Sequence, residues 1–230
     1  MVMDFDFTLL GEVPAPKSFM VRREFRGVGS FKLTVQRDAG GLLARDRVIY
    51  RPDRPEQGWI IHRVSRSGDT LTVDGTPLKG LAKRRICLPP LITGGAYNQF
   101  GYDLFTGDAE SAYLHFAANN LTAPEDAARA IPHLVLDANL HRGPELPWQA
   151  RFERLSDLFE DIGAATEVGW DIRPDFGAKR YVFGAWAGVD RTTGTGRCAL
   201  SRELGNVEGG SVTEDAGSAV LKLACKNPLT

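Results

Sequence analysis

The chain has 230 residues, of which 43% are hydrophobic and 25% are charged. A chain of this length and composition can bury a core without disulfides or metal ions to hold it together. Its formal net charge of −1 at pH 7 argues against non-specific attraction to nucleic acid or anionic lipid, which needs a basic excess. We therefore expect no sequence-specific binding to nucleic acid.

The first residues lack the basic and apolar regions of a signal peptide, and nowhere do eighteen apolar residues follow one another. These observations predict synthesis in the cytoplasm and no membrane anchor. Three cysteines, Cys87, Cys198 and Cys225, form no C-x-x-C pair. Their number and spacing predict neither a disulfide framework nor a zinc site. We expect no cofactor and no metal.

Residues 1–95 carry the pattern of short β-strands. Met3, Phe5, Phe7 and Leu9 alternate with polar residues, which predicts a half-buried strand. Further strands are expected at residues 19–26, 31–35, 47–51, 58–65 and 70–73, with turns rich in Gly, Pro and Asp between them. Many short strands at close spacing predict a β-barrel-like domain.

Residues 96–189 have a different character, because helical spacing appears. Apolar residues predict a helix over residues 108–119, and the capping box Thr122–Glu125 predicts a short helix that ends at Ala130. The clearest helix is expected at residues 151–167, on an apolar stripe formed by Phe152, Leu155, Phe159 and Ile162.

Alternating apolar residues after that helix predict a β-hairpin: Val168, Trp170 and Ile172 on one strand, and Tyr181, Phe183 and Ala185 on the other. The middle region is therefore expected to be an α+β domain. Residues 190–230 are expected to hold strands that return to the barrel or begin a second one. The fold class is α+β.

Several residue groups could carry chemistry. His133, Asp137 and His141 lie within nine residues, but Leu134 to Leu136 reads as a strand, where positions four apart are too distant for one metal ion. Asp4 and Asp6 share a strand face with no third ligand nearby, which favours a solvated edge. We expect no metal at either place.

Three other motifs have both a functional and a structural interpretation. Gly194–Ala199 matches a dinucleotide fingerprint, yet no strand–helix unit surrounds it, so a hairpin turn is expected. Lys83–Arg85 could contact phosphates or form a solvated face or subunit contact. The acids Glu153, Glu160 and Asp161 lie on a helix face without the cleft that glycoside hydrolysis needs.

Three segments together resemble a known family: GLAKRRICLPP at residues 80–90, residues 107–143, and above all residues 152–192, which end in GVDRT. ALSRELGNV at residues 199–207 extends the match. In this order they resemble the siphophage tail-tip, or baseplate, hub proteins, which are related to the tail-associated proteins and to the hubs of contractile tails.

The resemblance implies a structural subunit of the virion, assembled in the host cytoplasm and usually homotrimeric. Such hubs combine β-barrel-like domains with an inserted α+β domain. They close the distal end of the tail tube. Implied partners are the distal tail protein, the tail tube or tape-measure protein, and a fibre or receptor-binding protein. The family carries no catalytic residues in this portion, so none is expected here.

After Val207 the resemblance fades, and we expect a truncated, frameshifted or compact variant of the family. Tyr97, Phe100, Tyr102 and Phe105 are expected to supply interface contacts, with local loop packing as the alternative. The sequence thus predicts a structural tail-tip protein and no enzyme. A cell-wall-degrading enzyme of the tail tip and a carbohydrate-binding adhesin are the alternatives.

Overall fold

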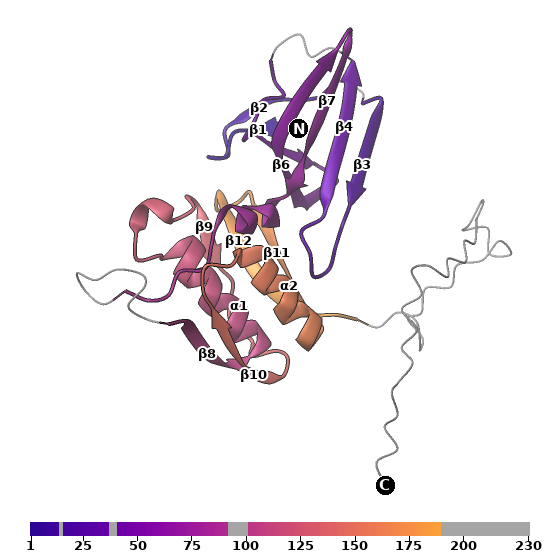
Figure 1. Cartoon of the computed structure of the whole chain (residues 1–230). Helices are drawn as coiled ribbons and strands as arrows, with labels where there is room; N and C mark the ends of the chain where they lie inside the picture. Colours follow the sequence, from indigo (N-terminus) through magenta and orange to yellow (C-terminus); the bar gives the residue numbers. More distant parts are fainter. Residues whose placement is uncertain (14–15, 37–40, 92–100, 190–230) are drawn as a thin grey trace, which may run out of the picture. The chain divides into compact units, whose positions relative to one another are not determined.

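The computed structural model describes residues 1–13, 16–36, 41–91 and 101–189 (Figure 1). The expectations for Tyr97, Phe100, the Gly194–Ala199 motif and the strands of residues 190–230 therefore lie outside the described residues. Met1–Gly188 form one compact unit.

The first part of the chain forms a seven-stranded antiparallel sheet in the order β2-β1-β5-β6-β7-β4-β3. Figure 1 shows that the sheet curls like half of a barrel. The barrel stays open because the end strands β2 and β3 do not pair with each other. Its strands are β1 (Val2–Met3), β2 (Leu9–Gly11), β3 (Ser18–Arg22), β4 (Ser30–Gln36), β5 (Val48–Arg51), β6 (Arg54–Ser67) and β7 (Thr70–Pro77).

Alternation along these strands divides the apolar side chains between two cores. Ile49 and Ile61 point to the inner face of the sheet, where they join a cluster with Phe31, Leu33 and Val73. Their neighbours Val48 and Ile60 point to the other face and join the core of the helical region. Because successive side chains of a strand point to opposite faces, a single strand supplies both cores.

The second part contains the helices and two smaller sheets. Its elements are η1 (Leu78–Arg84), β8 (Asp103–Asp108), α1 (Ala109–Ala117), η2 (Ala118–Thr122), η3 (Ala127–Arg129), β9 (Leu134–Leu136), β10 (Glu145–Ala150), α2 (Leu155–Thr166), β11 (Val168–Asp175) and β12 (Arg180–Ala187). Strands β8 and β10 form an antiparallel ribbon, and β9 runs parallel to β12 beside the β11–β12 hairpin. The predicted α+β class and the predicted hairpin are confirmed.

The single strand predicted from Met3 to Leu9 is wrong, because the chain turns between β1 and β2. Phe7 has a φ of 68°, and the Asp4 amide donates to the Thr8 carbonyl at 2.9 Å. The turn places Phe5 and Phe7 against Tyr181, each with ring centres 4.6 Å apart. Aromatic packing against a distant strand thus overrides the local alternation.

Two helix predictions also need correction. The Thr122–Glu125 capping box opens no helix; instead Asp126 caps the single turn η3, accepting from the Ala128 amide at 3.0 Å. Helix α2 begins at Leu155 rather than at residue 151, because Phe152 has a φ of 58°. Phe152 consequently leaves the buried stripe and is 46% exposed.

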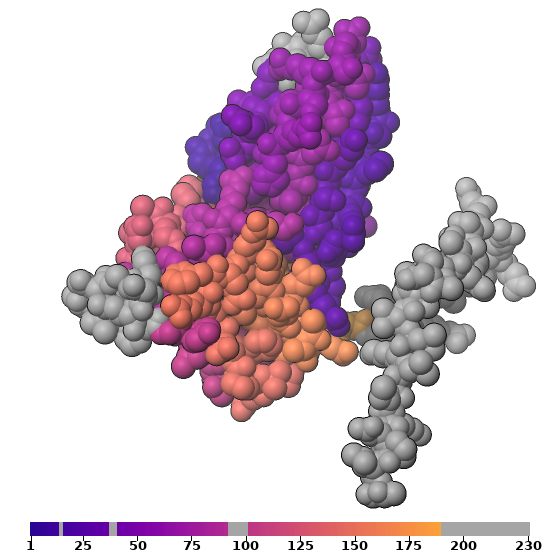
Figure 2. Space-filling view, viewed as in Figure 1, coloured from indigo at the N-terminus to yellow at the C-terminus, as the bar shows by residue number. Residues whose placement is uncertain are grey.

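The segment between β3 and β4 anchors the curled sheet to the hairpin β11–β12. The indole Nε1 of Trp170 donates to the Arg26 carbonyl at 2.7 Å, and the Lys79 ammonium donates to the Glu24 carbonyl at 2.6 Å. In the space-filling view, indigo atoms of the first part meet orange atoms of the second (Figure 2). These bonds hold the Glu24–Arg26 segment in place, although it belongs to neither strand.

Candidate functional site

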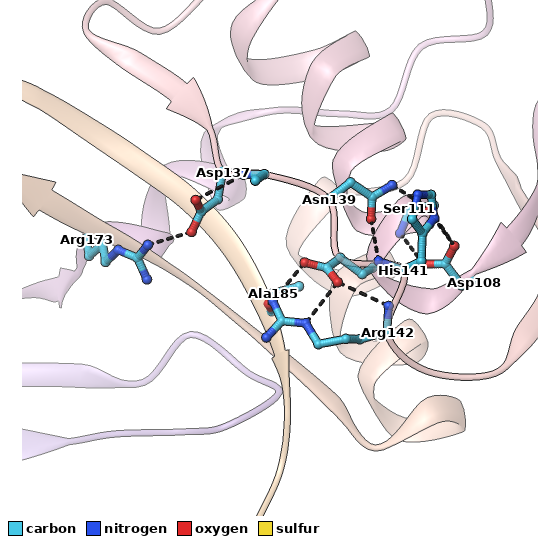
Figure 3. Close-up of polar contacts among 10 residues, drawn as sticks. Asp108, Ser111, Asp137, Asn139, His141, Arg142, Arg173 and Ala185 are labelled. Atoms are coloured by element: carbon cyan, nitrogen blue, oxygen red, sulfur yellow. Dashed lines mark hydrogen bonds and ion pairs between the residues drawn. The ribbon is translucent and has the colours of Figure 1, made fainter.

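A serine, a histidine and an aspartate meet at the start of α1 (Figure 3). Asp108 caps the helix: its Oδ1 accepts from the Ser111 amide at 2.9 Å, and its Oδ2 accepts from Ser111 Oγ at 2.6 Å. His141 Nδ1 lies 3.0 Å from Asp108 Oδ2 and 3.3 Å from Ser111 Oγ. These residue types are those of nucleophilic catalysis.

The arrangement does not match a catalytic triad. In a triad the imidazole uses one nitrogen for the serine and the other for the acid. Here Ser111 and Asp108 both approach Nδ1 of His141, and the serine proton is directed to the carboxylate. Partial burial alone would raise the pKa of Asp108, but the hydrogen bonds from Ser111 and then His141 outweigh it and lower the pKa. The cluster is a helix cap.

An ion pair with a buried carboxylate and a partly exposed arginine lies beside this cap. Arg142 donates from Nε to Glu110 Oε2 at 2.9 Å and from Nη2 to Glu110 Oε1 at 2.8 Å, and it also bonds the Ala185 carbonyl (Figure 3). Glu110 is 1% exposed. The bidentate pair ties the 137–142 segment to both α1 and β12, and so positions His141.

His133, Asp137 and His141, the residues considered for a metal site, lie in three different places. His133 lies beside the ring of Phe7, Asp137 pairs with Arg173, and His141 is at the helix cap. Over the described ranges, no three His, Cys, Asp or Glu side chains are placed to hold a metal ion.

The other candidate residues have structural partners as well. Asp4 lies 3.4 Å from Arg47, and Asp6 accepts from the Thr8 amide at 2.9 Å. Arg84 of the basic cluster pairs with Asp46 at 2.7 Å. Burial raises the pKa of the Cys87 thiol to about 12, which excludes a reactive thiolate at neutral pH.

The carboxylates considered for sugar hydrolysis do not face one another across a cleft. Glu153 precedes α2 and is partly buried, and burial raises its pKa. Glu160 and Asp161 lie within α2 and are exposed to solvent. An exposed helix face provides no desolvated acid opposite a second carboxylate.

The β8–β10 ribbon exposes apolar side chains to solvent. Leu104 is 69% exposed on the outer face of β8. Tyr102, just before β8, and Phe152, just after β10, are each 46% exposed. They flank the end of the ribbon where Asp103 pairs with Ala150. The Arg151 guanidinium lies 5.7 Å from the Tyr102 ring centre and 5.3 Å from that of Phe152. We call Tyr102, Leu104, Arg151 and Phe152 the ribbon surface.

One protein-family model matches almost the whole chain. The model of the family described as Siphovirus ReqiPepy6 Gp37-like protein matches residues 1–220. The chain belongs to this siphovirus family. The match continues past Val207, where the resemblance to the tail-tip hubs fades. Among curated proteins, no sequence matches significantly.

Similar solved structures share little sequence with this Gp37-like protein. A prophage tail protein, gp18 from Listeria monocytogenes EGD-e, is 11% identical with a TM-score of 0.49 and covers 79% of this chain and 49% of that one. The E. coli c3393 protein, described as a type VI secretion component similar to T4 tail proteins gp27 and gp5, is 9% identical with a TM-score of 0.42, covering 73% and 44%.

A tail protein from Neisseria meningitidis MC58 is 17% identical with a TM-score of 0.36, covering 76% of this chain and 47% of that one. The chain thus spans about half the length of the solved proteins it matches. Similarity at this level does not determine function.

The predicted interface residues of this Gp37-like protein have different surroundings. Tyr102 belongs to the ribbon surface, whereas Phe105 points to the inner face of the ribbon and stacks on His115 with ring centres 4.7 Å apart. Sequence reasoning missed Leu104 and Phe152. Leu104 and Phe105 are consecutive residues of β8, so their side chains point to opposite faces of the ribbon. Only the recognition of this strand would have predicted that Leu104 is exposed.

Among the described residues, the helices lack the length and the apolar composition that a membrane-spanning helix needs.

Proposed function

We propose that this Gp37-like protein is a structural subunit of the siphophage tail tip, a hub that closes the distal end of the tail tube. The observation that carries the proposal is the siphovirus family match over residues 1–220. The resemblance of residues 152–192 to tail-tip hubs supports the tail tip as the location within the virion. In this role the protein acts by binding its neighbours and catalyses no reaction.

The ribbon surface supports an assembly role. Exposed apolar side chains that gather on one surface mark sites of protein interaction, and interfaces are enriched in aromatic residues and arginine. Tyr102, Phe152 and Leu104 supply the apolar part, and Arg151 lies against both rings. We assign this surface, with Tyr97 and Phe100 as further candidates from sequence, to a contact with a neighbouring subunit.

The proposed partners are further copies of the chain, as a homotrimer, together with the distal tail protein. The tail tube or tape-measure protein and a fibre or receptor-binding protein complete the set. Assembly takes place in the host cytoplasm, and the mature location is the virion. The helix-cap geometry of Ser111 and His141 agrees with a non-catalytic role, because neither group is arranged to activate the other.

Mass photometry of the purified protein, alone and with the distal tail protein of the same phage, tests the proposal. We expect a trimer that binds the distal tail protein. Leu104→Asp should weaken assembly by about tenfold or more, because it places a charge in an interface core. Leu140→Asp is the matched control, since Leu140 is 63% exposed on another segment.

A monomer that ignores the distal tail protein would contradict the proposal. Equal effects of the two substitutions would remove the ribbon surface from the interface. Lysis of purified cell walls by the protein would instead favour the wall-degrading enzyme.

A further inference from the structure

A hollow of about 250 Å³ lies between the β3–β4 segment, the start of η1 and the hairpin β11–β12. It is separate from the helix cap and from the ribbon surface. The side chains that give it chemical character are Arg23, Glu24, Phe25, Lys79, Asp171 and Trp186.

Aromatic rings form one part of its wall. Phe25 is 40% exposed, and its ring lies 6.2 Å from that of Trp186 at an angle of 73°. The position of Phe25 depends on Gly169, because a Cβ there would lie 2.4 Å from the Phe25 ring. The rings are therefore held in place by the fold while part of their surface stays open.

A buried lysine forms the floor. Lys79 is 3% exposed, and its Nζ donates to the carbonyls of Glu24 at 2.6 Å and Trp170 at 3.3 Å. An ammonium group has three N–H donors, and these bonds use two of them. In the described part of the chain, Lys79 forms no ion pair with a carboxylate. The third donor has no hydrogen-bond acceptor among the described residues, and the ammonium lies 5.0 Å from the centre of the Trp170 ring.

Asp171 supplies an acceptor at the same hollow. One carboxylate oxygen accepts from the Ile172 amide at 2.8 Å, and among the described residues no cation pairs with this carboxylate. Arg23, which also borders the hollow, likewise has no acidic partner there. Donors and an acceptor that the protein leaves partly unused thus converge beside the aromatic wall.

The charges around the hollow decide which ligand fits. Among the lining side chains, Arg23 and Lys79 are balanced by Glu24 and Asp171, so the lining itself attracts neither a free anion nor a free cation by net charge. Glu24 also pairs with Arg22, which lies outside the lining, at 3.0 Å. Phosphates would meet two carboxylates, and amines would meet two cations. A neutral molecule with hydroxyl groups on one side and C–H groups on the other can use the donors, the acceptor and the rings together.

We infer that this hollow binds a neutral sugar residue, with its C–H face on Phe25 and Trp186 and its hydroxyl groups on Asp171 and Lys79. The volume of about 250 Å³ is just below the usual range of about 300–1,000 Å³ for small-molecule pockets, which suits a single sugar ring. Recognition of this kind adds carbohydrate binding to a structural subunit and requires no bond cleavage.

Saturation-transfer difference NMR with the methyl glycosides of glucose, galactose, mannose and N-acetylglucosamine tests the inference on the full chain. We expect transfer to at least one glycoside, with a dissociation constant on the order of 1 mM. Trp186→Ala should abolish the transfer, and Asp171→Asn should weaken binding about tenfold. Asp69→Asn, in an exposed hairpin turn, should leave it unchanged.

Circular dichroism confirms that each variant is folded, and Trp186→Leu replaces Trp186→Ala if the latter is not. The inference is overturned if the folded protein transfers saturation to none of the four glycosides, or if both pocket variants bind as the parent does. Because the hollow is distinct from the ribbon surface, assembly measured on Asp171→Asn reports on the tail-tip role separately.

Discussion

The curled sheet of residues 1–77 and the α+β region of residues 78–188 bury different kinds of side chain. In the described part of the sheet, every buried side chain other than glycine is apolar, and its ion pairs lie at the surface. All buried polar or charged side chains of the described residues belong to the second region: Lys79, Asp103, Glu110, Asn120, Ser156 and Thr166.

The difference teaches how each region is specified. An apolar core accepts any side chain of suitable volume, so its stability depends on packing. A buried polar or charged group is tolerated only with its hydrogen-bond or ionic partners in place, so the second region depends on particular contacts. Breaking one pair should therefore cost more than a comparable change in the sheet, and the following measurements test this order.

Arg142→Met should have the largest effect, because it leaves the buried Glu110 carboxylate without its cation and with only the backbone amide of residue 142 as a donor. We expect a loss of about 3–5 kcal/mol in the free energy of unfolding, measured with urea. Arg173→Met removes the exposed pair with Asp137 and should cost less than about 1 kcal/mol. Equal losses would show that burial of the Glu110 pair is unimportant.

Ile61→Ala tests the apolar core of the sheet. Ile61 is fully buried on the inner face, so the substitution should cost about 2–5 kcal/mol by leaving a cavity. Ile61→Leu keeps the volume and should cost less than about 1.5 kcal/mol. If the leucine variant unfolds as readily as the alanine variant, shape rather than volume governs this core.

Tyr113→Phe removes a buried hydroxyl from the second region without changing the ring. The hydroxyl lies 2.9 Å from the Phe159 carbonyl and 3.0 Å from that of Val168, and these two acceptors share its single proton. The loss should be about 1–2 kcal/mol in urea unfolding, since the carbonyls lose a donor in a buried site. Tyr50→Phe, at a ring packed on Phe176, is the control and should be nearly neutral.

The smallest expected effect is the dependence of stability on pH through Asp108. The folded pKa of Asp108 is lowered from its ordinary value of 3.8, so its stabilising contribution is complete above that value and is lost as pH falls through the folded pKa. Asp108→Asn should cost less than about 1 kcal/mol at pH 6, because asparagine caps a helix about as well as aspartate and only the carboxylate's bonds to Ser111 Oγ and His141 are weakened. Its urea-unfolding free energy should then fall less steeply than that of the parent between about pH 5 and pH 3. Parallel pH profiles would contradict this assignment.

Sequence patterns were sufficient where the relevant neighbours are close in the chain. Alternation predicted the hairpin β11–β12, and the apolar stripe predicted α2 from Leu155 onward, because both depend on spacings of two to four residues. The family resemblance implied the same combination of a barrel-like domain and an α+β domain that the residue patterns predicted.

The ribbon and the helix cap depended on contacts between distant residues. Leu104 of β8 pairs with Gln149 of β10, and Ser111 meets His141, although each pair is separated by thirty or more residues. Only two of the four predicted interface residues, Tyr102 and Phe105, fall among the described residues, and the pairing of β8 with β10 places them on opposite sides of the ribbon.

By itself the sequence determined which segments become strands and helices over much of the chain, because side-chain periodicity acts locally. The tertiary structure decided which charges are buried together, where Phe5 and Phe7 pack, and which apolar side chains stay in solvent. Those outcomes follow from the path that brings separate segments together, and the energy of burying a charge or a ring depends on what the other segment supplies.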